Sequence, residues 1–238
     1  MTDIAIAYDV ASLEQALALD QRLGAGPEYA KIGLELFTAA GPGVVRELKA
    51  RDRRVFLDLK LHDIPNTVRG AAAAAARLGA DLLTVHATGG APMIAAAAEG
   101  IRRVDGETRV VAVTVLTSFD GYNLPPGFEQ PFFPDLVIAR QLRMALGAGA
   151  HGIVCAANDL PMVRAIHKRP FFSVTPGIRL ADTSRDDQAR VSTVTEAVRK
   201  GSSLLVLGRA VTAAPDARAA LERARTERDA AQTAVSTC

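Results

Sequence analysis

The sequence predicts an α/β protein, a single-domain (β/α)₈ TIM barrel over residues 1–229 with a frayed C-terminal tail at 230–238. Short apolar runs that suit strands alternate with helical segments, which indicates a parallel sheet because parallel strands need a crossover connection. Eight such units and a length of 238 residues fit one closed barrel. Polar residues also gather where the predicted strands end, which is where barrel enzymes build their sites. A doubly wound open sheet is the structural alternative.

The predicted strands each contain a short apolar run and begin near Ile4, Tyr29, Arg54, Leu82, Arg109, Gly152, Phe171 and Leu204. The segments between them carry helix signals such as a capping residue, Ser12 being one, or an opening proline. The predicted helices cover 13–23, 44–50, 67–78, 193–200 and 215–229, and three more start near Pro92, Pro134 and Pro161. Two connections, 118–134 and 176–192, are longer than usual barrel loops, and long loops on a rigid barrel are often functional lids. The first of them is either a dimer contact or a lid.

Composition and charge exclude several classes of protein. The formal net charge is +2, with 28 basic and 26 acidic residues, and no clustered basic face points to nucleic acid. No apolar run reaches the roughly 18 residues of a membrane span, and the first residues do not resemble a signal peptide. The 2 cysteines cannot form a disulfide framework, so the expected location is the cytoplasm. No His or Cys spacing suggests a metal site, and no cofactor is predicted.

The third predicted strand carries the most informative residues. Alternate side chains of a strand share a face, so Asp58 and Lys60 are expected to point into the barrel. Asp63 follows in the loop, where its carboxylate can turn back over the strand end, and Lys31 ends the neighbouring strand. An ammonium group between two carboxylates stays protonated, which suits proton donation or electrostatic stabilisation and not Schiff-base chemistry. A purely structural ion-pair network is the alternative, and the position at the barrel's catalytic end favours function.

A phosphate site is predicted at the loops after the seventh and eighth strands. Those loops contain Pro176-Gly-Ile-Arg179 and Gly208-Arg209. Glycine lets the backbone approach a ligand closely, and arginine offers forked donors to a dianion. Barrels commonly bind phosphate with these two loops and the N-terminus of a short helix.

The segment Asp58-Leu-Lys-Leu-His-Asp63-Ile64-Pro-Asn-Thr67 resembles the signature of the orotidine 5′-monophosphate decarboxylase family. The resemblance extends from Asp9 to Arg209. It implies decarboxylation of orotidine 5′-monophosphate to UMP and CO₂, the last step of de novo pyrimidine nucleotide synthesis, with no metal or organic cofactor. Lys60, held between Asp58 and Asp63, would stabilise charge and donate a proton to C6.

The resemblance also implies the binding residues. The equivalents of Asp9 and Lys31 bind the ribose hydroxyls, and that of Thr117 lies near the pyrimidine. The implied phosphate-binding set is Pro176, Arg179, Gly208 and Arg209, with Gln188 as a flap residue that closes over the phosphate. A homodimer is implied as well, in which Asp63, Ile64 and Thr67 reach into the neighbouring subunit's site.

Two other functions stay open. Sugar-phosphate enzymes of the ketogulonate- and hexulose-phosphate group share a similar barrel and an Asp-x-Lys-x-x-Asp segment, and they look metal-dependent. The continuation over residues 64–67 and Gln188 argue against them. A non-catalytic nucleotide-binding protein is the second, and the intact charged set argues against it. His86 ends the fourth strand, where it either lines the pocket or is a hydrogen-bonded structural residue.

Overall fold

The computed structural model describes residues 1–117, 119, 133–180 and 191–236. Among these residues, eight parallel strands form a closed ring, because β1 pairs with both β2 and β9 while β6 pairs with both β5 and β7. The strands of the ring are β1 (Asp3–Ala7), β2 (Tyr29–Ile32), β3 (Val55–Leu61), β4 (Leu82–His86), β5 (Arg109–Val113), β6 (Gly152–Val154), β7 (Phe172–Arg179) and β9 (Leu204–Leu207). The TIM barrel is therefore confirmed and the open sheet is wrong.

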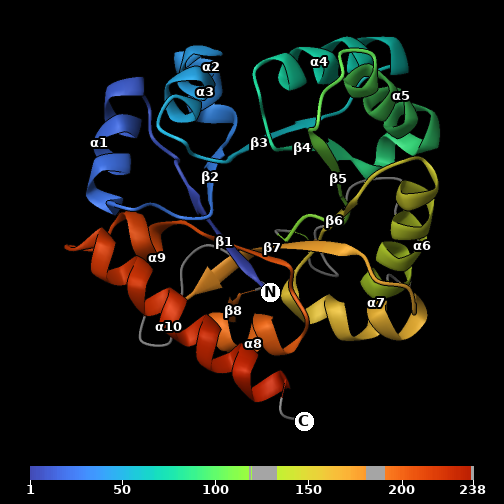
Figure 1. The fold of residues 1–238 in the computed structure, drawn as a ribbon. Coiled ribbons are helices and arrows are strands. Elements are labelled where there is room, and N and C mark those ends of the chain that lie inside the picture. Colours follow the sequence, from blue (N-terminus) through green and yellow to red (C-terminus); the bar gives the residue numbers. More distant parts are fainter. Residues whose placement is uncertain (118, 120–132, 181–190, 237–238) are drawn as a thin grey trace.

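Helices surround the strands, as Figure 1 shows. They are α1 (Leu13–Leu23), α2 (Leu34–Ala40), α3 (Gly43–Lys49), α4 (Pro65–Arg77), α5 (Gly90–Arg102), α6 (Pro134–Gly147), α7 (Leu160–Ile166), α8 (Val194–Arg199), α9 (Arg209–Thr212) and α10 (Ala217–Ser236). Two 3₁₀ turns, η1 (Ala87–Gly89) and η2 (Ala157–Asp159), and a two-residue strand, β8 (Ser192–Thr193), complete the described elements. No helix in the described part of the chain is both long and apolar enough to cross a membrane.

Four elements differ from the sequence predictions. The short helices α2 and α9 were not expected, and β7 continues through Arg179 where a loop was expected from Pro176. Residues 230–236 continue helix α10 instead of forming a frayed tail, because Ala231 is only 3% exposed and packs into the core. Residues 237–238, and most of the two long connections, lie outside the described residues.

The barrel separates two apolar layers. Inward-facing residues fill the ring: Ala5, Ala7, Tyr29, Phe56, Leu82, Val111, Val174, Leu204 and Val206. A second, larger cluster lies between the strands and the surrounding helices and includes Val55 and Leu57. This alternation along β3 confirms the predicted faces, with Phe56 inside the barrel and its neighbours outside. Burial of each such side chain stabilises the fold by about 1.5–3 kcal/mol.

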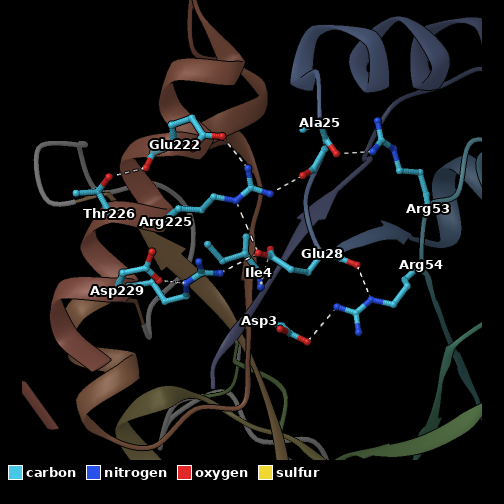
Figure 2. A network of polar contacts seen from close by, with 12 residues as sticks. Asp3, Ile4, Ala25, Glu28, Arg53, Arg54, Glu222, Arg225, Thr226 and Asp229 are labelled. Carbon is cyan, nitrogen blue, oxygen red and sulfur yellow. Dashed lines mark hydrogen bonds and ion pairs between the residues drawn. The ribbon is translucent and has the colours of Figure 1, made fainter. Parts of the chain in front are cut away.

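A polar network fixes α10 against the N-terminal ends of the first strands (Figure 2). Glu28, just before β2, accepts hydrogen bonds from the backbone N–H of Ile4 at 3.2 Å and from Arg228 at 2.8 Å. Arg225 of α10 donates to the carbonyl of Gly26. Arg54 pairs with Asp3 at 3.2 Å across the start of β3 and β1. This end of a barrel contributes stability, whereas the other end is free to hold a site.

Candidate active site

A cavity of about 380 Å³ opens at the C-terminal end of the barrel strands. Its size is in the range of sites for small organic ligands. Every barrel strand other than β4, with the residues just after it, contributes to the lining. The lining residues are Ala7, Asp9, Lys31, Phe56, Asp58, Lys60, Val113, Val115, Leu116, Thr117, Val154, Cys155, Val174, Pro176, Gly177, Ile178, Arg179, Val206, Gly208 and Arg209. Nine predicted site residues are thereby brought together: Asp9, Lys31, Asp58, Lys60, Thr117, Pro176, Arg179, Gly208 and Arg209.

Charged groups of alternating sign cross one wall of this cavity. The Oδ2 atom of Asp58 lies 2.8 Å from Nζ of Lys60 and 3.6 Å from Nζ of Lys31. Lys31 also pairs with Oδ1 of Asp9 at 3.1 Å. The side chains of Lys31 and Asp58 are only 11% and 13% exposed, so these charges attract one another more strongly than they would in water.

The Asp58 carboxylate is stabilised in its ionised form. Burial by itself would raise the pKa of Asp58, but attraction to Lys31 and Lys60 and hydrogen bonds from Lys60 and Thr84 outweigh it. The pKa of Asp58 is therefore held below its ordinary value. At neutral pH a permanent negative charge thus lies between two ammonium groups.

The backbone at Lys60 has an uncommon conformation. Its φ is 49°, in the left-handed region that residues with a side chain seldom adopt. Strand β3 changes register against β4 here, since Leu57 is opposite Leu83 while Leu61 is opposite Val85. Such a conformation costs about 1–3 kcal/mol and is found mostly at functional sites. The period-two pattern predicted the face of Lys60 correctly but not this irregularity.

Thr84 is a residue of the site that the sequence predictions missed. It is fully buried in β4, where its Oγ1 accepts from the Lys60 N–H at 2.8 Å and donates to Oδ1 of Asp58 at 3.0 Å. The available signal was a single hydroxyl within the otherwise apolar run from Leu82 to Val85. It lies on the strand next to the one that carries Asp58.

The far side of the cavity is basic. Arg179 ends β7, and Gly208 and Arg209 mark the start of α9, as the predicted phosphate site requires. Gly177 has a φ of 77°, a conformation that suits glycine, at the point where β7 changes register against β9. Four cationic side chains and two carboxylates line the whole cavity, an excess of two positive charges. The cavity is therefore suited to a ligand that carries a phosphate dianion.

Asp63, Ile64 and Thr67 lie outside this cavity. All three are exposed, and Ile64 is 67% exposed. The expectation that Asp63 turns back over Lys60 is wrong for this chain, because its Oδ1 accepts instead from the N–H of Ile64 at 2.6 Å. The chain leaves β3 at Leu61 and enters α4 at Pro65, so Asp63 lies in a three-residue connection between the two elements. Gln188 lies outside the described residues.

His86 is not among the residues that line the cavity. Its ring centroid is 5.4 Å from that of His62. Burial, and then the neighbouring His62 and Lys60, lower the pKa of His86. The described residues contain no group of three or more His, Cys, Asp or Glu side chains that could hold a metal ion.

Comparisons with known proteins agree with this geometry. Residues 2–224 match the model of the orotidine 5′-phosphate decarboxylase / HUMPS family. An orotidine 5′-phosphate decarboxylase of Anaeromyxobacter sp. (strain K) is 51% identical over 191 residues, covering 80% of this chain and 82% of that protein. One from Cutibacterium acnes is 43% identical, covering 96% and 97%. The crystal structure of the Lactobacillus acidophilus decarboxylase superposes with a TM-score of 0.84 at 33% identity, over 96% of this chain and 100% of that one.

Proposed function

The chain belongs to the orotidine 5′-phosphate decarboxylase / HUMPS family, and we propose that it decarboxylates orotidine 5′-monophosphate to UMP and CO₂. One observation carries the proposal: Lys60 and Lys31 share the buried Asp58 carboxylate inside a cavity whose opposite side holds two arginines. The two lysines offer the positive charge that a carbanion needs, and the two arginines offer the forked donors that a phosphate needs.

Lys60 acts on the reacting carbon. The bond between C6 and the carboxylate carbon breaks, CO₂ leaves, and the electron pair remains on C6. The ammonium group of Lys60 stabilises this developing negative charge and then transfers a proton to C6, which gives UMP. The neutral amine recovers its proton from solvent. Asp58 holds the ammonium at the reacting carbon through its 2.8 Å ion pair with Lys60.

The remaining residues bind the substrate. Asp9 and Lys31 bind the ribose hydroxyls, and Thr117 lies beside the pyrimidine. The phosphate dianion is bound by Arg179, Arg209, the backbone amide of Gly208 and the end of β7 from Pro176. Gln188 closes over the phosphate, so that binding energy far from C6 serves the chemical step.

The proposal includes a homodimer with shared sites. Asp63, Ile64 and Thr67 are exposed on their own chain. In the proposed dimer each of them reaches the site of the partner subunit. Asp63 of that subunit supplies the second carboxylate beside Lys60. A mixture of two inactive variants tests this arrangement. Hybrid dimers of Lys60→Ala and Asp63→Ala contain one intact site, so mixing restores about a quarter of wild-type activity if the site is shared. No recovery, with hybrid dimers shown to form, contradicts sharing.

An ultraviolet assay tests the proposed reaction. The purified chain is incubated with orotidine 5′-monophosphate and EDTA while the orotate chromophore is followed. Rapid loss of the chromophore with formation of UMP supports the proposal. Activity on a sugar phosphate that depends on Mg²⁺, with no loss of the chromophore, identifies the other branch of the family. Tight UMP binding without any turnover identifies a nucleotide-binding protein.

A further inference from the structure

We propose that Thr84 is a positioning residue that orients both members of the Asp58–Lys60 pair for the decarboxylation. The inference rests on the proposed function and deepens it. Thr84 does not line the cavity, so it acts through Asp58 and Lys60 and not by direct contact with the substrate. Thr84 lies on β4, the one barrel strand whose residues do not line the cavity in the described structure.

The Thr84 hydroxyl can donate one hydrogen bond and accept others at the same time. A threonine hydroxyl has one proton to donate and two lone pairs that accept. Thr84 donates to Oδ1 of Asp58 at 3.0 Å and accepts from the N–H of Lys60 at 2.8 Å. Its side chain is 0% exposed, so bulk water does not reach it. One buried group is therefore bonded to the side chain of Asp58 and to the backbone of Lys60.

The two oxygens of the Asp58 carboxylate have different partners. Oδ1 is bonded to Thr84, whereas Oδ2 faces the ammonium groups of Lys60 at 2.8 Å and Lys31 at 3.6 Å. Rotation of a carboxylate about its terminal torsion is broad and roughly two-fold. The Thr84 bond fixes that rotation and directs Oδ2 toward the two cations. Without it the same charge would remain, and only its contacts with the two ammonium groups would orient it.

The backbone N–H of Lys60 also depends on Thr84. Its left-handed conformation takes it out of the regular ladder between β3 and β4, because the register shifts on either side of it. The Thr84 hydroxyl supplies the acceptor that the ladder does not. Buried backbone N–H groups require such a partner. Since the direction of the Lys60 side chain follows from its backbone torsions, this bond also aims the ammonium group.

Matched substitutions separate positioning from packing. Thr84→Val keeps the shape of the side chain and removes the hydroxyl, whereas Thr84→Ser keeps the hydroxyl. Thr108→Val is the control, because Thr108 is also buried, lies at the opposite end of the barrel and donates to the carbonyl of Ala80 at 2.5 Å. Thr84→Ala is a second variant without the hydroxyl, in case valine prevents folding.

The measured quantities are kcat and KM for orotidine 5′-monophosphate and the Kd for UMP. Thr84→Val and Thr84→Ala are expected to lower kcat at least about tenfold, with KM and the Kd for UMP within about twofold of wild type. Thr84→Ser is expected to restore most of kcat, and Thr108→Val to leave it unchanged. If Thr84→Val or Thr84→Ala retains wild-type kcat, or if UMP binding falls in step with kcat, the inference is overturned. A wild-type chain that does not consume the substrate overturns the proposed function and this inference with it.

Discussion

Replacement of Asp58 by Asn tests the electrostatics of the site, because it removes one negative charge and changes little in shape. The carboxylate is the shared partner of Lys60 at 2.8 Å and Lys31 at 3.6 Å. Removal of one partner of a buried ion pair costs about 3–5 kcal/mol, because the other charge remains buried without compensation. Lys60 is 32% exposed and Lys31 keeps its contact with Asp9, so the lower end applies, about 3 kcal/mol. For a chain of this length that corresponds to a fall in Tm of about 6–12 °C.

Thermal denaturation followed by circular dichroism measures this change at pH 7. Asp52→Asn is the control: Asp52 is exposed, and its positive φ of 59° suits Asn as well as Asp, so Tm should stay within about 2 °C. The pKa of Asp58 is lowered, so its stabilising contribution is present above the unfolded-state value near 3.8 and is lost as the pH falls further. The difference in Tm between wild type and Asp58→Asn should therefore narrow below about pH 4. An Asp58→Asn variant that melts within 2 °C of wild type would refute this reasoning.

Three further predictions follow from the same geometry. Arg209→Ala should raise KM for the nucleotide about ten- to a hundredfold in steady-state assays, because a charged phosphate loses a forked donor, and unchanged KM contradicts the phosphate assignment. Gly33→Ala would place a Cβ 3.1 Å from Nζ of Lys31, so it should raise KM about threefold, and wild-type KM would show that the contact relaxes freely. Burial, and then His62 and other neighbours, lower the pKa of His86, so its contribution to stability is present above about pH 6.5 and is lost at lower pH. Urea unfolding at pH 7 and pH 5 should therefore show a larger loss of stability for wild type than for His86→Gln, and equal losses would be contrary to this prediction.

The fold was predictable because its signals are local. Ser12 caps α1 as expected, with its Oγ accepting from the N–H of Gln15 at 3.3 Å. The strand pattern also placed Asp58 and Lys60 correctly on the inner face, since the alternation of side chains along a strand depends on neighbouring residues alone. The length of α10 was underestimated because the burial of Ala231 depends on packing against the rest of the barrel.

The details of the site depend on contacts between distant segments. The left-handed conformation of Lys60 is accompanied by a bond to Thr84, which is 24 positions away and has no motif of its own. Asp63 was expected beside Lys60, but its side chain is exposed and its Oδ1 accepts from the N–H of Ile64 instead. In the proposed dimer its partner is in another chain, and no spacing within one sequence encodes that neighbour.

The turnover of orotidine 5′-monophosphate by Lys60→Ala tests the central claim most directly. If Lys60 both stabilises the carbanion and protonates it, kcat should fall at least about 10⁴-fold relative to wild type. The Kd for UMP should stay within about tenfold, because Arg179 and Arg209 lie at the other side of the cavity. A folded Lys60→Ala variant with near-normal turnover would contradict the account.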